Sequence, residues 1–145
     1  MFTVERKRSI DQPAERIKAI VADPNQLSRL MPRAERVEVL ARSENRARVA
    51  VVVRLGKLGL QRVEGEARLL DDGVRFVAVQ PLQLDVRWTI LPRDQGTDVV
   101  VRLAAEAPAK LAAMARFIPQ RMIEERIGVE LESALTALAG AAAQP

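Results

Sequence analysis

The side chains of this chain that could carry acid–base chemistry are carboxylates, lysines and arginines, because His, Cys and Tyr are all absent. Without His or Cys, no Ser–His or Cys–His nucleophilic system can form. Zinc would have to be held by carboxylates alone, which are poor ligands for a metal that prefers nitrogen and sulfur. We therefore expect no metal, no cofactor and no catalytic residue, although Asp, Glu and Lys leave open a limited acid–base reaction.

The most obvious carboxylate pair is Glu64 and Glu66, which are two residues apart in an alternating segment. They share their phase with Arg62 and Arg68, and the apolar Val63 lies in the opposite phase. This alternation predicts a half-buried strand whose carboxylates make cross-strand ion pairs on the solvent face. We expect these carboxylates to be structural and not catalytic.

Polar residues that fall in an apolar phase are candidates for holding the polar end of a ligand. Arg8 shares the phase of Ile10, and Gln80 shares the phase of Ala78. A buried arginine needs a carboxylate, an anion or a carbonyl group as its partner. We predict Arg8 and Gln80 as polar anchors, the alternative being a β-bulge or a strand end that turns them toward water.

The elements that would position these residues follow from the spacing of the apolar side chains. The 145 residues fit one domain, which we expect to span residues 1–140, with a frayed tail at 141–145. Residues 2–10 alternate as a strand, and Pro13 and Asp23-Pro24 predict the starts of two short helices. A period of two then continues from residue 37 to 105, with turns at 43–45, 56–59, 71–73 and 94–97.

The last part of the chain changes to helical spacing. Pro119 predicts a kink or a new start, and apolar residues then recur on one side from Ile118 to Leu138. The order predicts an α+β fold. An antiparallel, strongly curved sheet of about seven strands would wrap around a long C-terminal helix, with two short helices after the first strand.

Short motifs reinforce this order: residues 10–17 at the first strand-to-helix entry, Asp23-Pro24 leading to Met31-Pro32, residues 63–71, and Gly96-Thr97. With these motifs the chain resembles the helix-grip (SRPBCC) superfamily of Bet v 1 allergens, START lipid-transfer domains and polyketide cyclases, over nearly its whole length. The stretch 23–40 looks most like the carbon monoxide dehydrogenase G-subunit branch.

The resemblance implies a small protein that binds hydrophobic molecules, quinone-like lipids among them, and in some members recruits an enzyme to a membrane. One departure is visible: Leu27 and Leu30 stand where relatives often carry Trp, so an aromatic clamp at the cavity mouth is absent.

A curved sheet around a helix leaves room for an apolar cavity, and such cavities are the usual ligand sites. We predict that Met31 closes one end of the cavity, and that its lining comes from the sheet (Val53, Leu55, Val63, Phe76, Val86, Trp88 and Leu103) and from the helix side (Met114, Phe117, Ile118 and Met122). The alternative is that these side chains pack together as an ordinary core.

The loop before residue 61 places a cation beside apolar side chains, namely Lys57 with Leu58 and Leu60. Such a loop suits contact with an anionic membrane surface or with a protein partner. The alternative is that Leu58 or Leu60 folds back over the sheet.

The charge of +4, from 23 basic and 19 acidic residues, is typical of an ordinary solvated surface and argues against nucleic-acid binding. We predict a non-catalytic carrier or recruitment protein that binds a hydrophobic small molecule or lipid. The alternatives are a polyketide cyclase- or hydratase-like enzyme and a ligand-free protein-interaction module. The chain shows neither a signal peptide nor an apolar run of membrane-spanning length, so we expect a cytoplasmic protein, with peripheral contact to a membrane or protein partner.

Overall fold

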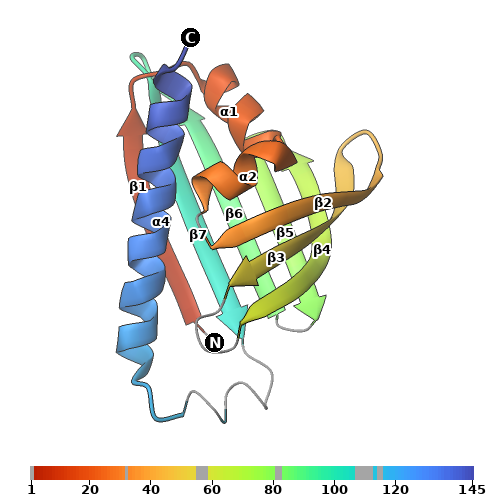
Figure 1. The fold of residues 1–145 in the computed structure, drawn as a ribbon. Helices are drawn as coiled ribbons and strands as arrows, with labels where there is room; N and C mark the ends of the chain where they lie inside the picture. Colours follow the sequence, from red (N-terminus) through yellow and green to blue (C-terminus); the bar gives the residue numbers. More distant parts are fainter. Residues whose placement is uncertain (1, 32, 55–58, 81–82, 107–112, 114–115) are drawn as a thin grey trace.

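The computed structural model describes residues 2–31, 33–54, 59–80, 83–106, 113 and 116–145. It contains, in chain order, β1 (Phe2–Ile10), α1 (Ala14–Ala22), α2 (Pro24–Leu30), β2 (Ala34–Arg42), β3 (Arg46–Arg54), β4 (Leu60–Leu70), β5 (Gly73–Gln80), β6 (Gln83–Pro92), β7 (Thr97–Glu106) and α4 (Gln120–Ala143). The predicted α+β order is confirmed (Figure 1).

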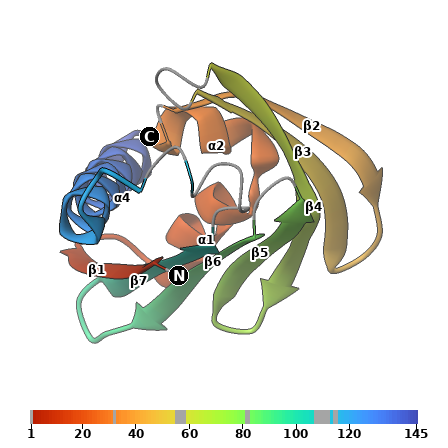
Figure 2. The ribbon, with the colours of Figure 1, turned by 90° about the horizontal axis from the view of Figure 1, so that it is seen from below.

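The seven strands form one antiparallel sheet in the order β1-β7-β6-β5-β4-β3-β2. Each strand from β2 to β7 pairs with the next along the chain, whereas β1 pairs with β7 and so joins the start of the chain to its last strand. The sheet is strongly curved, and the described helices α1, α2 and α4 lie on its concave side (Figure 2). We refer to this side as the inner face and to the opposite side as the outer face.

The start of α2 follows the local sequence closely. The side chain of Asp23 accepts a hydrogen bond from the Asn25 backbone N–H (3.0 Å), and Pro24 occupies the first turn, where its missing N–H costs nothing. The first helix begins one residue later than predicted, because Pro13 is the residue preceding α1 and not its first helical residue.

Helix α4 starts after Pro119, which therefore marks the start of this helix and not a kink within it. The helix buries Leu131, Leu135 and Leu138 against the sheet and α1. It continues beyond residue 140, where fraying was expected: Ala142 is buried, and its carbonyl accepts a hydrogen bond from the Arg16 side chain.

The position of α4 on the sheet is asymmetric. It packs mainly on β1, makes few contacts with β7, and touches α1 and α2 on its other side. Arg6 of β1 contributes to this packing: its guanidinium covers Gly128 of α4, and its Nε lies 3.2 Å from Glu132 Oε1. Because α4 is held over this edge, it does not pack closely on the inner face of β3 to β5.

The buried residues accordingly form two clusters. The larger one joins β1, β6 and β7 to α1 and α4 around Ile17, Val99 and Leu131. The smaller one lies under α2 between β2 and β3, around Val49 and Val51. Half-buried apolar side chains, described below, lie between them.

The outer face carries a row of arginines that crosses five strands. Each stands directly opposite the next in the pairing of β3 to β7: Arg46, Arg68, Arg75, Arg87 and Arg102. Like charges in opposite positions destabilise a sheet, and carboxylates offset this cost at three of the five positions. Arg68 pairs with Glu66, Arg75 with Asp85 and Arg87 with Asp72.

Candidate functional site

The inner face of the sheet is apolar from one edge almost to the other. Successive residues of a strand lie on opposite faces, so the pairing register defines rows of side chains that share a face. One inner row starts at buried Val4 and crosses the sheet through these residues in order: Val4, Leu103, Val86, Phe76, Ala67, Ala47 and Arg42. This apolar row ends at a cation on the edge strand β2.

The carboxylates of the strands lie on the outer face. In the described strands, every Asp or Glu that has a cross-strand partner occupies a position on the outer face. These residues are Glu5, Glu38, Glu64, Glu66, Asp85, Asp98 and Glu106. Glu35 lies at a register irregularity of β2 and contacts Arg54 (2.6 Å). Acid–base chemistry on a molecule at the inner face would therefore need groups from outside these strands.

The predicted cavity residues of the sheet fall into two groups. Val63, Val86 and Trp88 are buried in the core. Val53, Phe76 and Leu103 are only half-buried, as is Met31, which packs against both clusters. Val53 and Phe76 lie on the part of the inner face that α4 leaves uncovered, whereas Leu103 is on β7, beside the part that α4 covers, and Met31 follows α2.

The orientation of Phe76 depends on a glycine on the neighbouring strand. A Cβ atom on Gly65 would lie 2.8 Å from Phe76 Cζ and would also overlap the Val77 carbonyl oxygen. The aromatic ring thus rests over the Gly65 backbone, on the inner face of β4.

The predicted cavity residues of the helix side are placed differently from the expectation. Phe117 is 81% exposed, and Ile118 and Met122 are also exposed, because they precede or begin α4 at the lower end of the molecule in Figure 1, beyond the part that packs on the sheet. Leu60, at the start of β4, is exposed at the same end. Leu55, Lys57, Leu58 and Met114 lie outside the described residues.

Of the two predicted polar anchors, Arg8 does lie on the inner face, but α4 supplies its partner. Its Nη1 donates to Thr136 Oγ1 at 3.0 Å. Gln80 lies on the outer face. Val79 is an extra residue in β5, since Gly65 pairs with Ala78 while Glu64 pairs with Gln80, and this bulge reverses the phase of the strand end.

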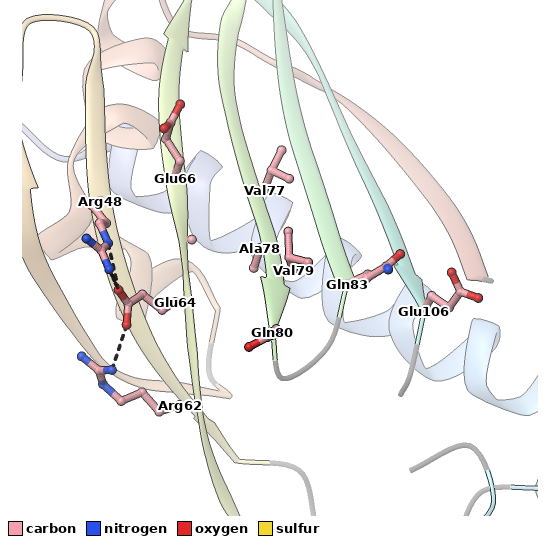
Figure 3. Close-up of a pocket in the computed structure, with 11 residues that line it drawn as sticks. Arg48, Arg62, Glu64, Glu66, Val77, Ala78, Val79, Gln80, Gln83 and Glu106 are labelled. Carbon is pink, nitrogen blue, oxygen red and sulfur yellow. Dashed lines mark hydrogen bonds and ion pairs between the residues drawn. The ribbon is translucent and has the colours of Figure 1, made fainter. Parts of the chain in front are cut away.

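Gln80 lines a hollow of about 1170 Å³ on the outer face (Figure 3). The hollow also contains Glu64, which lies 2.6 Å from Arg48 and 3.1 Å from Arg62. Hydrogen bonding from Arg48, aided by the charge of Arg62, holds the pKa of Glu64 below its usual range, so the carboxylate stays ionised at neutral pH. The predicted cross-strand ion pair is confirmed for Glu64, which contacts Arg48 of β3, whereas Glu66 pairs with Arg68 of its own strand.

A polar pair beside the uncovered part of the inner face was not anticipated from the sequence. Arg33, between α2 and β2, places its Nε 2.8 Å from Glu130 Oε1 on α4, and both side chains are partly shielded from solvent. The pair joins α4 to the β2–β3 side of the sheet. No periodic signal marks it, since its members are 97 residues apart.

The described residues include neither a cluster of metal-binding side chains nor a membrane-spanning helix. No set of Asp and Glu side chains among them is arranged to hold a metal ion. None of the helices that the structure describes is long and apolar enough to cross a membrane.

The curved sheet, the two short helices after β1 and the long final helix together define a helix-grip α+β fold. Residues 1–143 match the model of the family described as polyketide cyclase / dehydrase and lipid transport, and the chain belongs to this family. No curated protein matches the sequence.

Solved structures share the fold at low sequence identity. A protein from Thermus thermophilus is 24% identical, with a TM-score of 0.80 and coverage of 97% of each chain. A START superfamily protein from Mycobacterium smegmatis is 19% identical (TM-score 0.77, 95% of this chain and 94% of that chain). The Zhui aromatase/cyclase from Streptomyces sp. R1128 is 18% identical (TM-score 0.76, 97% and 93%).

Proposed function

We propose that this protein binds a hydrophobic small molecule or lipid on the inner face of the sheet and does not convert it chemically. The observation that carries the proposal is the separation of the two faces: an apolar row crosses the inner face, and the paired strand carboxylates all lie outside. Apolar surface that is neither buried nor needed in the core is the usual floor of a ligand site. Half-buried Phe76 and Leu103 supply such a floor.

The finer form of the proposal concerns the ligand and its delivery. The likeness to the carbon monoxide dehydrogenase G-subunit branch favours a quinone-like lipid as the ligand. The protein would either carry this lipid or use it to recruit a partner. Exposed Leu60, Phe117 and Met122 lie at one end of the molecule, and the Arg116 guanidinium lies 4.7 Å from the centre of the Phe117 ring. Apolar side chains beside a cation suit contact with an anionic bilayer from which such a ligand is taken.

The test is native mass spectrometry of freshly purified protein, followed by organic extraction and titration with decylubiquinone. We expect one bound hydrophobic molecule per chain. Leu103→Trp fills the inner face and should abolish binding, whereas Ala104→Trp, its neighbour on the outer face of β7, should leave binding intact. Circular dichroism checks that both variants fold.

Three outcomes would contradict the proposal. An empty protein that also ignores decylubiquinone would favour a protein-interaction module. Equal loss of binding in both folded tryptophan variants would move the site away from the inner face. Recovery of the added ligand in a cyclised or dehydrated form would favour the enzymes of the family, with Glu130 as the first carboxylate to replace.

A further inference from the structure

A second hollow, of about 300 Å³, opens at the end of the sheet where β3 begins. It lies between the α1–α2 junction, the turn that joins β2 to β3, and the adjoining parts of β4 and β5. Its volume is at the lower limit for small-molecule sites. We call it the upper pocket.

The floor of the upper pocket is a continuation of the apolar inner face. Ala47 and Ala67 belong to the inner row that leads to Phe76, and Val74 lies one inner position further along β5. Leu69, also on the inner face, is exposed within it. Two alanines side by side leave space that larger residues would fill, so an apolar chain on this floor could extend toward Phe76.

The rim of the upper pocket carries two cations without a partner. Arg42 is paired with Ala47 and so lies at the end of the inner apolar row. Arg46, the first residue of β3, belongs to the outer face but also lines the rim. Across the described part of the chain neither guanidinium takes part in a hydrogen bond or ion pair. By contrast, Arg6 and Arg8, which share the inner face with Arg42, are bonded to side chains of α4.

The other charged side chains at the rim do not neutralise Arg42 and Arg46. Arg68 also lines the pocket and is paired with Glu66, outside it. Glu44 is the one carboxylate among the described lining residues, and it forms no hydrogen bond or ion pair with Arg42 or Arg46. The rim is therefore net positive beside an apolar floor, which is the arrangement that receives an amphipathic anion.

We propose that the upper pocket binds the anionic end of an amphipathic ligand, a carboxylate or a phosphate monoester, with Arg42 and Arg46 as its partners. The apolar part of the ligand lies on Ala47, Ala67 and Leu69 and continues along the inner row. The inference rests on the proposed function, and it adds the chemical class of the ligand: an acidic lipid and not a neutral one.

The test is isothermal titration of the wild-type protein with decanoate, decyl phosphate and decanol. We expect both anions to bind at least about tenfold more tightly than decanol, since hydrogen bonds to charged groups are the strong ones. Arg42→Gln with Arg46→Gln should remove this preference and leave decanol binding unchanged. Arg36→Gln is the matched control, because Arg36 is on the same edge strand but pairs with Glu38, outside the pocket. A preference for one anion identifies the headgroup.

Equal affinities for decanol and decanoate, or an anion preference that survives the double replacement, would overturn the inference. Either result would leave the proposed function standing provided that Leu103→Trp still abolishes binding. An anion preference that depends on Arg42 but not on Leu103 would support the upper pocket and count against the inner face of β7. Absence of binding by all three probes would overturn the inference, and the proposed function as well if decylubiquinone also fails to bind.

Discussion

Gly65 is the position at which adding one methyl group tests the packing of the inner face most directly. The added Cβ would lie 2.8 Å from Phe76 Cζ and 3.0 Å from Ala78 Cβ, and would overlap the Val77 carbonyl oxygen. Replacing glycine by alanine stabilises a compatible site by about 0.4–1 kcal/mol through the unfolded chain, whereas overpacking costs about 1–3 kcal/mol. Because one obstacle is backbone, we expect Gly65→Ala to lower the free energy of unfolding by about 1–2 kcal/mol.

Gly140 of α4 is the matched control, since a Cβ there would meet nothing within 4 Å. The same replacement should raise the free energy of unfolding by about 0.5–1 kcal/mol, the ordinary helix preference of alanine. Urea unfolding followed by the fluorescence of Trp88, the one tryptophan, measures both, because this side chain is 4% exposed and loses its environment on unfolding. A Gly65→Ala protein as stable as the wild type, with an unchanged urea dependence, would refute the described contact with Phe76.

Three further replacements test the core and the outer face. Thr97→Val should cost about 1–3 kcal/mol, because the buried threonine donates a 2.7 Å hydrogen bond to the Gln12 carbonyl, and urea unfolding would measure it. Leu131→Ala should cost about 3–5 kcal/mol, since this side chain is wholly buried between α4 and the sheet; a cost below 1 kcal/mol would contradict that packing. Hydrogen bonding from Arg75 lowers the pKa of Asp85, so its contribution is present above the unfolded pKa near 4 and is lost as the pH falls through the folded pKa. The stability difference between wild type and Asp85→Asn should therefore be constant from pH 5 to 7, amount to less than about 1 kcal/mol, and shrink below about pH 4; a difference that grows in acid would exclude the pair.

Features with a local cause could be predicted from the sequence. Asp23-Pro24 specifies the start of a helix whatever surrounds it, and the alternation around Val63 marks a strand with one buried face. The packing of an antiparallel sheet against a long final helix then follows, because each apolar face must be covered. The ion pairs of Glu64 and Glu66 belong to this group, because the alternation of β4 places these carboxylates on the same face as Arg62 and Arg68.

Features that depend on register could not be predicted in this way. Arg42 lies at the end of an apolar row only because β2 pairs with β3 as it does, after a register irregularity near Ala41. Phe117 and Met122 continue an apolar helical pattern, but periodicity does not say how far the sheet reaches beneath a helix. The arginine row of the outer face is likewise invisible in the sequence, where its members are seven to 22 residues apart.

The bulge at Val79 has a consequence for how such proteins diversify. Because side chains alternate along a strand, a change that let Val79 pair with Glu64 would remove the bulge and move Gln80 to the face of Ala78 and Phe76. An amide would then project over the apolar floor, although no residue in contact with a ligand had been substituted. Changes that add or remove a bulge at a strand end are thus a route by which descendants of one chain acquire new ligand preferences, and alignments that compare only residue identities would miss it.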